Sequence, residues 1–263
     1  MNWMIPWYVD DYLDLDSAQR SALENRLAHQ LDWYCRTQLP VYAAFLKSVK
    51  QDFEAPGQSI TRDRFAHYLE TLEQYWKGLM ARIGPDVADI VITASDDQIE
   101  ELFRNIEKEN LERQRTYVDP PPREILQNRA HRMVDRLEQW IGDLTSAQYA
   151  AVEKWSHDMG ATTDLWLANR RRQQQAFRNL IATRAVDPTF KEKFTILLVS
   201  PEVVRTKAYQ VQLDRNIALM LDLLTDIEKT LTDAQRSHLL AYLESLAEDF
   251  DRLACQIPPK DAQ

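Results

Sequence analysis

The apolar residues of this chain recur mostly at intervals of three and four positions, the repeat of an α-helix that buries one face. The clearest case follows Thr61, where the gaps between successive apolar residues are 3, 1, 3, 4, 3, 1 and 3. We expect this helix to stop at Gly84-Pro85, because proline lacks the backbone N–H that a continuing helix needs. The apolar face comprises Phe65, Tyr68, Leu69, Leu72, Trp76, Leu79, Met80 and Ile83.

Three further segments carry the same helical repeat, and one short segment is ambiguous. Helices are predicted after Pro122, after Pro201 and in the last part of the chain, around Leu243. The best candidate for a strand is Ile196 to Val199, but this run is short and a buried helix end accounts for it better. The pattern therefore predicts an all-α fold of long antiparallel amphipathic helices, with a strand content below ~5%.

Proline marks the clearest division of the chain. Three consecutive prolines, Pro120 to Pro122, hold the backbone extended and cannot continue a helix. They separate a helical half at residues 1–118 from a second helical half at residues 123–257. We expect the two halves to pack together as one compact unit.

Four predicted helix starts share one local motif. In each, a small cap-forming residue is followed three positions later by Gln, which is the spacing of a capping box. The cap oxygen accepts a hydrogen bond from the backbone N–H three residues on, and the Gln side chain reaches back to the N–H of the cap. The motif residues are Leu15, Gln19, Ser95, Gln98, Leu144, Thr145, Gln148, Leu231, Thr232 and Gln235.

The four motifs have two interpretations. The simpler one is four ordinary helix starts, and it is favoured because the two halves share little other residue identity. The alternative is an internal duplication, in which each half holds two marked helices. The separations agree with this alternative, since Gln19 and Gln98 are 79 residues apart and Gln148 and Gln235 are 87 apart.

Two stretches resemble known families. Leu144 to Gln148 and Leu231 to Gln235 read Leu-Thr-x-x-Gln, which resembles the repeated motif of the Spy and CpxP family of periplasmic helical proteins. That family comprises ATP-independent chaperones and stress-response regulators. In this chain Leu15 to Gln19 has Asp in place of Thr, and Ala94 to Gln98 lacks the Leu.

The second resemblance lies at the start of the chain. The stretch from Trp3 to Leu15 resembles the beginning of an uncharacterised family of Gram-negative lipoproteins, in which W-x-x-x-W-x-x-D-D-Y-x-D-L follows a lipid-modified cysteine. This resemblance implies a periplasmic protein held at the outer membrane by an N-terminal lipid. The cysteine that would carry the lipid is not among these residues.

Composition and charge narrow the possible partners. The formal net charge is −9, which disfavours a nucleic-acid partner because binding to phosphates needs a basic surface. Neither G-x-G-x-x-G nor a Walker A motif occurs, so no nucleotide cofactor is expected. No run approaches ~18 apolar residues, so no membrane-spanning helix is expected. Cys35 and Cys255 permit one disulfide, but two buried thiols are favoured because the sequence shows no pairing geometry.

Candidate catalytic and metal-binding residues do not fall into a functional pattern. The five histidines form no H-x-x-x-H pair and no E-x-x-H motif, which a di-iron bundle requires. The aspartates between Asp10 and Asp16 lack the glycine and glutamate of a calcium loop. The basic stretch that begins at Arg170 is read as a salt-bridged, solvated helix rather than a patch for anionic lipid or an acidic client. We therefore expect no catalytic site, no cofactor and no metal.

These observations lead to a functional expectation. The absence of a catalytic pattern favours a non-catalytic protein. The two resemblances imply a periplasmic, lipoprotein-derived protein that holds an unfolded polypeptide or another envelope protein on a concave helical surface. Abundant Trp, Tyr and Met residues would supply adaptable contacts. The alternative is a structural cell-envelope protein without client binding, and an enzyme ranks third.

The capping boxes give a first prediction. Replacing Thr145 with Ala removes the side-chain oxygen that caps its helix, so the free energy of unfolding should fall by about 1 kcal/mol. Urea denaturation followed by circular dichroism measures this change. Coordinates that placed Thr145 or Thr232 within a helix would contradict the assignment.

Overall fold

The computed structural model describes residues 14–55, 57, 59–160 and 162–255, and this part of the chain is helical without any strand. The all-α prediction is therefore confirmed, and the ambiguous run from Ile196 to Val199 is the end of a helix. The helices are α2 (Ser17–Thr37), α3 (Leu39–Glu54), α4 (Arg62–Thr93), α5 (Asp96–Tyr117), α6 (Pro122–Ile141), α7 (Ser146–Met159), α8 (Thr163–Ile181), α9 (Phe190–Val199), the 3₁₀ turn η1 (Pro201–Val204), α10 (Lys207–Lys229) and α11 (Asp233–Leu253).

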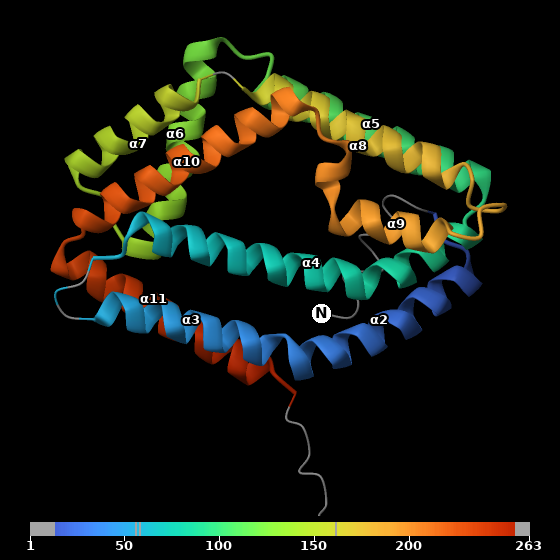
Figure 1. Cartoon of the computed structure of the whole chain (residues 1–263), viewed down its shortest axis with the longest axis horizontal. Helices are drawn as coiled ribbons and strands as arrows, with labels where there is room; N and C mark the ends of the chain where they lie inside the picture. Colours follow the sequence, from blue (N-terminus) through green and yellow to red (C-terminus); the bar gives the residue numbers. More distant parts are fainter. Residues whose placement is uncertain (1–13, 56, 58, 161, 256–263) are drawn as a thin grey trace, which may run out of the picture.

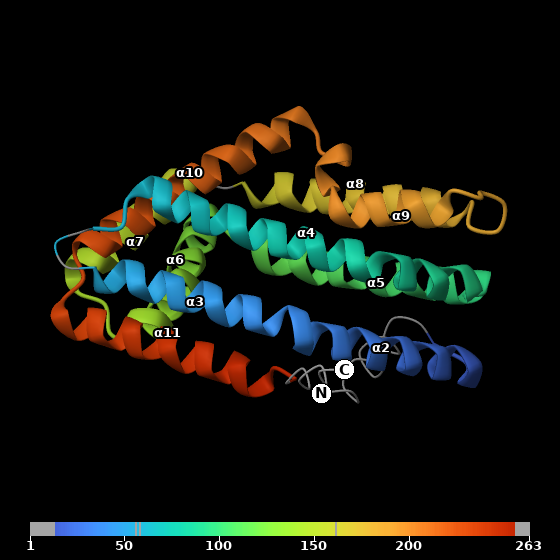
Figure 2. The same cartoon turned by 60° about the horizontal axis from the view of Figure 1, so that its bottom comes forward.

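The 32-residue α4 helix is the long central element of the fold. In Figure 1 it crosses the middle of the molecule, with α2 and α3 on one side and α5 with α8 on the other. Figure 2 shows α3 alongside α11, and α9 packs on the second half of α4. Segments from the two ends of the chain are thus direct neighbours.

The apolar faces meet in two main clusters. The first core joins α3 and the start of α4 to α6, α7, α10 and α11, with Phe53 and Tyr68 packed among residues such as Val152 and Leu243. The second core joins the end of α4 and the start of α5 to α8 and α9, and Phe190 is almost fully buried there. Both clusters mix residues from before and after the triple proline, so the stretches 1–118 and 123–257 share their cores.

Helix α4 does not stop at Gly84-Pro85, and the prediction that it would was wrong. An internal proline costs about 3 kcal/mol, but here tertiary packing outweighs that local cost. Gly84 is buried, and a Cβ at this position would lie 3.0 Å from side-chain atoms of Thr195 on α9. The helices approach closely because position 84 has no side chain, and residues beyond Pro85 such as Ala88 are buried in the second core.

The two cysteines form a disulfide, with a Cα–Cα distance of 5.1 Å between Cys35 in α2 and Cys255 just after α11. The favoured interpretation of two buried thiols was therefore wrong. The two positions are 220 residues apart, and only the packing of α3 along α11 brings them together. The backbone N–H of Cys255 also donates to the carbonyl oxygen of Cys35 at 3.1 Å. The end of the last helix is thereby fastened to the end of α2.

Opening this disulfide should destabilise the protein. A crosslink across 220 residues restricts the unfolded chain, so reduction should lower the free energy of unfolding by about 2–5 kcal/mol. Urea denaturation with and without dithiothreitol measures the difference. The Cys35→Ser/Cys255→Ser variant should unfold like the reduced protein and should not respond to the reductant. Two thiols that react with a maleimide in the unreduced, denatured protein would contradict the pairing.

Candidate functional site

The four predicted capping boxes are present, and the structure arranges them as two pairs. Asp16, Ser95, Thr145 and Thr232 each cap a helix, and the Gln three residues later bonds back to the cap N–H. The N-termini of α2 and α5 meet at what we call the first junction. The N-termini of α7 and α11 meet at the second junction. The sequence predicted the caps but not this pairing.

At the first junction the side-chain amides of Gln19 and Gln98 bond to each other. Nε2 of Gln19 donates to Oε1 of Gln98 at 3.1 Å, and Nε2 of Gln98 donates back at 2.8 Å. Each amide also donates across the junction to a backbone carbonyl. Gln19 reaches the carbonyl of Thr93 at 2.9 Å, and Gln98 reaches that of Asp14.

The second junction repeats this arrangement. Gln148 and Gln235 exchange amide hydrogen bonds of 3.0 Å and 2.8 Å. Gln148 donates to the carbonyl of Thr230 at 3.2 Å, and Gln235 donates to that of Asp143 at 2.7 Å. At both junctions the accepting carbonyl lies two residues before the partner's cap. Four unrelated helix starts do not account for this equivalence, which favours the internal duplication.

These hydrogen bonds use the whole capacity of the four amides. A side-chain amide offers two N–H donors and an oxygen with two lone pairs. Each oxygen here accepts from its own cap N–H and from the partner amide, and each nitrogen donates to the partner oxygen and to a carbonyl. Gln148 and Gln235 are also buried, with 1% and 5% of their surface exposed. The motif residues therefore hold helices together and leave no group to bind a client.

The leucines of the motif also stabilise the fold. Leu15 packs near Ile90 and Leu102, Leu144 is buried in the first core, and Leu231 packs against that core. The motif residues are therefore structural, and the candidate binding sites lie elsewhere in the molecule.

The strongest candidate is an open cavity of about 800 Å³ lined by α2, α4, α5, α8 and α9, which we call the apolar cavity. It lies next to the second core and is wide enough to leave the inner faces of these helices incompletely covered. Its walls are almost wholly apolar, and aliphatic and aromatic side chains come from all five helices. They include Leu23, Leu27, Leu31, Leu79, Ile83, Val87, Ile90, Leu102, Phe103, Ile106, Phe177 and Leu198.

A small polar group stands among these walls. Arg26 of α2 forms ion pairs with Asp86 at 2.7 Å and Asp89 at 3.0 Å, and Lys191 also pairs with Asp89. Burial alone would raise the pKa of Asp89, but Lys191 and Arg26 outweigh burial and hold this pKa below its usual range. The charges of this group balance one another.

Gln30 is the exception in this polar group. Its Nε2 donates to Asp86 at 2.5 Å, which fixes the orientation of the amide because only the nitrogen can donate to a carboxylate. Its Oε1 is buried and has no hydrogen-bond partner within the described residues. The polar edge of the apolar cavity therefore offers one unsatisfied acceptor.

Residues 11–210 match the model of a family of unknown function, DUF6279. The chain belongs to this family. No curated protein and no solved structure matches the chain. Because the function of the family is unknown, membership assigns no activity to the chain.

The basic stretch of α8 is engaged within the protein, as expected of a salt-bridged helix. Arg170 pairs with Glu109 at 3.0 Å and Arg171 pairs with Glu107 at 3.1 Å. Arg172 donates to the carbonyl of Val204. The helices in the described ranges are all too short or too polar to cross a bilayer, and no cluster of metal-binding side chains was found in the same ranges. The aspartates at positions 10 and 11 lie outside the described residues.

The amide pair at the second junction is open to a direct test. Replacing Gln148 with Leu leaves one donor and one acceptor site of Gln235, the N–H of Thr145 and the carbonyl of Thr230 without their present partners in a buried site. The free energy of unfolding should fall by about 1–3 kcal/mol. The double variant Gln148→Leu/Gln235→Leu should cost less than the sum of the single changes, and urea denaturation of all four proteins measures this coupling.

The matched control is Gln127→Leu, at an exposed position on α6, which should change stability by less than about 0.5 kcal/mol. The same replacement at Gln98 should cost less than at Gln148, because the first junction is only partly buried. Strictly additive effects of the two replacements would count against the paired amides.

Proposed function

We propose that this protein is a non-catalytic binding protein of the cell envelope, and that apolar side chains of a polypeptide client enter the apolar cavity. The observation that carries the proposal is the cavity itself, with about 800 Å³ behind almost wholly apolar walls. Ligand sites in proteins typically measure about 300–1,000 Å³. Apolar surface left uncovered on this scale is unfavourable in water, and in folded proteins it usually marks a binding surface.

The polar edge favours a polypeptide over an acyl lipid. The anionic head group of a fatty acid or phospholipid needs a cation without a partner, but Arg26 and Lys191 are both paired with carboxylates. The unsatisfied group is the Oε1 atom of Gln30, which needs a donor. Polypeptides carry N–H and O–H donors on backbone and side chains, whereas an acyl chain carries none.

The apolar walls also limit how a client can enter. A backbone N–H or carbonyl placed against hydrocarbon without a partner costs free energy, so an extended chain would bind poorly inside the cavity. An amphipathic helix meets its backbone hydrogen bonds internally and can present one apolar face. We therefore propose that the client presents a short amphipathic helix, or a few apolar side chains, to the cavity.

Two observations support a location in the cell envelope. The Cys35–Cys255 disulfide is typical of oxidising compartments such as the bacterial periplasm. The Leu-Thr-x-x-Gln motifs and the aromatic start of the chain resemble periplasmic and lipid-anchored helical proteins. We also propose a lipid anchor, which would need a modified cysteine that is not among the residues of this sequence before Trp3.

The chemistry of the cavity walls supports a function without catalysis. No histidine lines the apolar cavity, and its single carboxylate, Asp86, is held by Arg26 and Gln30. A general base or a nucleophile with an adjacent base is therefore not assembled among the lining residues. The alternative proposal is a structural envelope protein that binds no client.

The test is suppression of aggregation without ATP. A client unfolded in urea is diluted into buffer with equimolar to several-fold excess protein, and light scattering is followed. Reductant is left out because it would open the disulfide. Both an acidic and a basic client are used, since the net charge of −9 should favour the basic one and salt should reduce that preference.

Variants link the result to the apolar cavity. Ile83→Trp adds bulk within the cavity and should abolish suppression, whereas Val211→Trp introduces the same indole at an exposed position on α10 and should not. If Ile83→Trp unfolds, Leu27→Trp, which lines the same cavity from α2, serves the same purpose. Failure of the unaltered protein with both clients would leave the structural envelope protein as the better proposal.

A further inference from the structure

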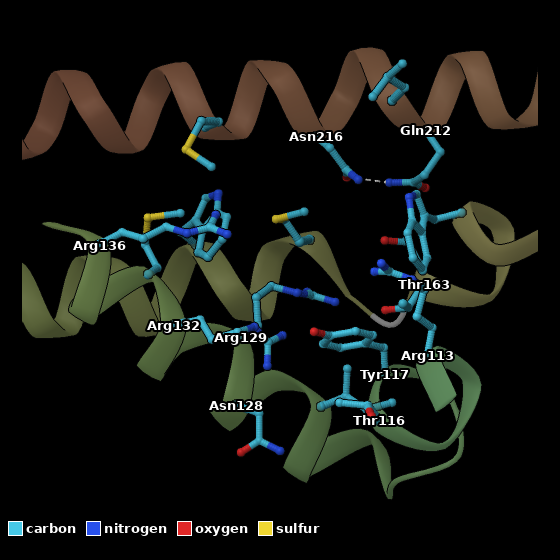
Figure 3. A pocket seen from close by; sticks show the side chains of 18 of the residues that line it. Arg113, Thr116, Tyr117, Asn128, Arg129, Arg132, Arg136, Thr163, Gln212 and Asn216 are labelled. Atoms are coloured by element: carbon cyan, nitrogen blue, oxygen red, sulfur yellow. Dashed lines mark hydrogen bonds between the residues drawn. The ribbon is translucent and has the colours of Figure 1, made fainter. Parts of the chain in front are cut away.

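A second cavity, of about 500 Å³, lies between α5, α6, α7, α8 and α10, and we call it the arginine cleft. Figure 3 shows Arg129, Arg132 and Arg136 reaching into it from α6, Arg113 entering from α5, and Gln212 and Asn216 facing them from α10. No aspartate or glutamate is among the residues that line it. Four arginines without a lining acid are notable in a chain whose net charge is −9.

Only part of this positive charge is compensated by the protein. Nη1 of Arg129 donates to the carbonyls of Ser156 and Gly160 at 3.1 Å and 2.8 Å, at the C-terminal end of α7, where helix carbonyls carry partial negative charge. Burial and the nearby charge of Arg132 lower the pKa of Arg129. The guanidinium of Arg113 is 3.6 Å from Glu109, which Arg170 approaches more closely at 3.0 Å.

The other two arginines have no carboxylate partner among the residues that the structure describes. Arg132 stacks over the ring of Tyr117 at 5.0 Å, and neither it nor Arg136 forms an ion pair with a residue in the described ranges. They are four positions apart on α6, so their like charges lie on one face of the helix. Their repulsion slightly destabilises α6 when no anion is bound. Both are exposed, which leaves their N–H groups open to a ligand.

Two residues that line the arginine cleft also carry donors without acceptors. Trp155 is only 6% exposed, and its buried Nε1–H has no partner in the part of the chain that the structure describes. The Nε–H group of Arg113 is also buried and has no partner among the described residues. Buried polar groups are normally paired, so these two donors mark a place for an acceptor that the protein does not supply. Met133, Met159 and Trp166 line the rest of the space with apolar surface.

From these contacts we infer that the arginine cleft binds an organic phosphate ester, with the phosphate at Arg132 and Arg136 and the body of the molecule against Trp155. Phosphate oxygens match the fork of N–H groups on a guanidinium, and a dianion balances two unpaired arginines. The cleft has room for more than the phosphate, and ester or hydroxyl oxygens of the body would accept from Trp155 and Arg113. This ligand is independent of the client proposed for the apolar cavity.

The inference is tested by isothermal titration calorimetry at low, constant chloride. Glucose 1-phosphate represents a soluble ester and dihexanoyl phosphatidic acid, below its micellar concentration, represents a lipid head group. At least one should bind, and the preferred one identifies the source of the ligand. Arg132→Gln and Arg136→Gln should each weaken binding about tenfold or more, because each removes a charge-assisted hydrogen-bond donor.

The matched control is Arg104→Gln, an exposed arginine of α5 that pairs with Glu101 and does not line the cleft. It removes the same charge and should leave binding within about twofold, as expected when only the screened long-range field changes. A second readout is the indole N–H signal of Trp155, assigned with Trp155→Phe, which should shift when the ester is added.

Three results would overturn the inference. They are the absence of binding by both esters, an equal loss of affinity in Arg104→Gln, and tighter binding of the tricarboxylate tricarballylate than of either ester. Folding of the arginine variants is checked by their circular dichroism spectra. If one of them does not fold, the Trp155 signal in the unaltered protein decides, and no shift with either ester would then refute the site.

Discussion

Two pairs of glutamine side chains organise this molecule. A helix start leaves several backbone N–H groups without intrahelical partners, and a capping box satisfies one of them with the Gln amide. The same amide still has one lone pair and two N–H groups to place. At both junctions these are met by a second Gln, held at a second helix start, and by a carbonyl that precedes its cap. Any other relative position of the two helix starts would leave amide groups without partners, so each pair of helix starts is held in one register.

The two halves of the chain are joined by contacts other than the junctions. Each junction closes within one half, Gln19 with Gln98 and Gln148 with Gln235, and so fixes the local layout of that half. The apolar faces then meet between the halves, as α3 does with α11 and α4 with α9. The paired amides therefore fix contacts within each half, whereas shared apolar cores, ion pairs such as Arg170–Glu109 and the disulfide join the two halves. The cavities lie where five helices from both halves meet incompletely.

The sequence predicted the features that depend on neighbouring residues. Helical periodicity and the capping spacing act within a few positions, so the fold class and the caps at Ser95, Thr145 and Thr232 followed directly. Features set by distant contacts did not follow. The helix through Pro85 depends on the close approach of Thr195, and the disulfide depends on α11 packing on α3.

The same distinction applies to the candidate sites. The apolar cavity draws its walls from helices far apart in sequence, so no local pattern predicted it. The arginine cleft did leave a signal, since positions 129, 132 and 136 place three arginines on one face of α6. Arg170 to Arg172 form a denser run of positive charge in the sequence, but the structure pairs those residues with acids and a carbonyl.

The disulfide also makes the chain from Cys35 to Cys255 a covalently closed ring, with most of α2 outside it. Consider a force that pulls the two ends of the chain apart. The disulfide would carry the tension directly from Cys35 to Cys255, so the backbone of α3 to α11 would not be stretched. Such a force would strip away the segment before Cys35 and break the bonds of Gln19. Because Leu23, Leu27 and Leu31 lie on that segment, tension would uncover the apolar cavity while the remaining helices stayed folded.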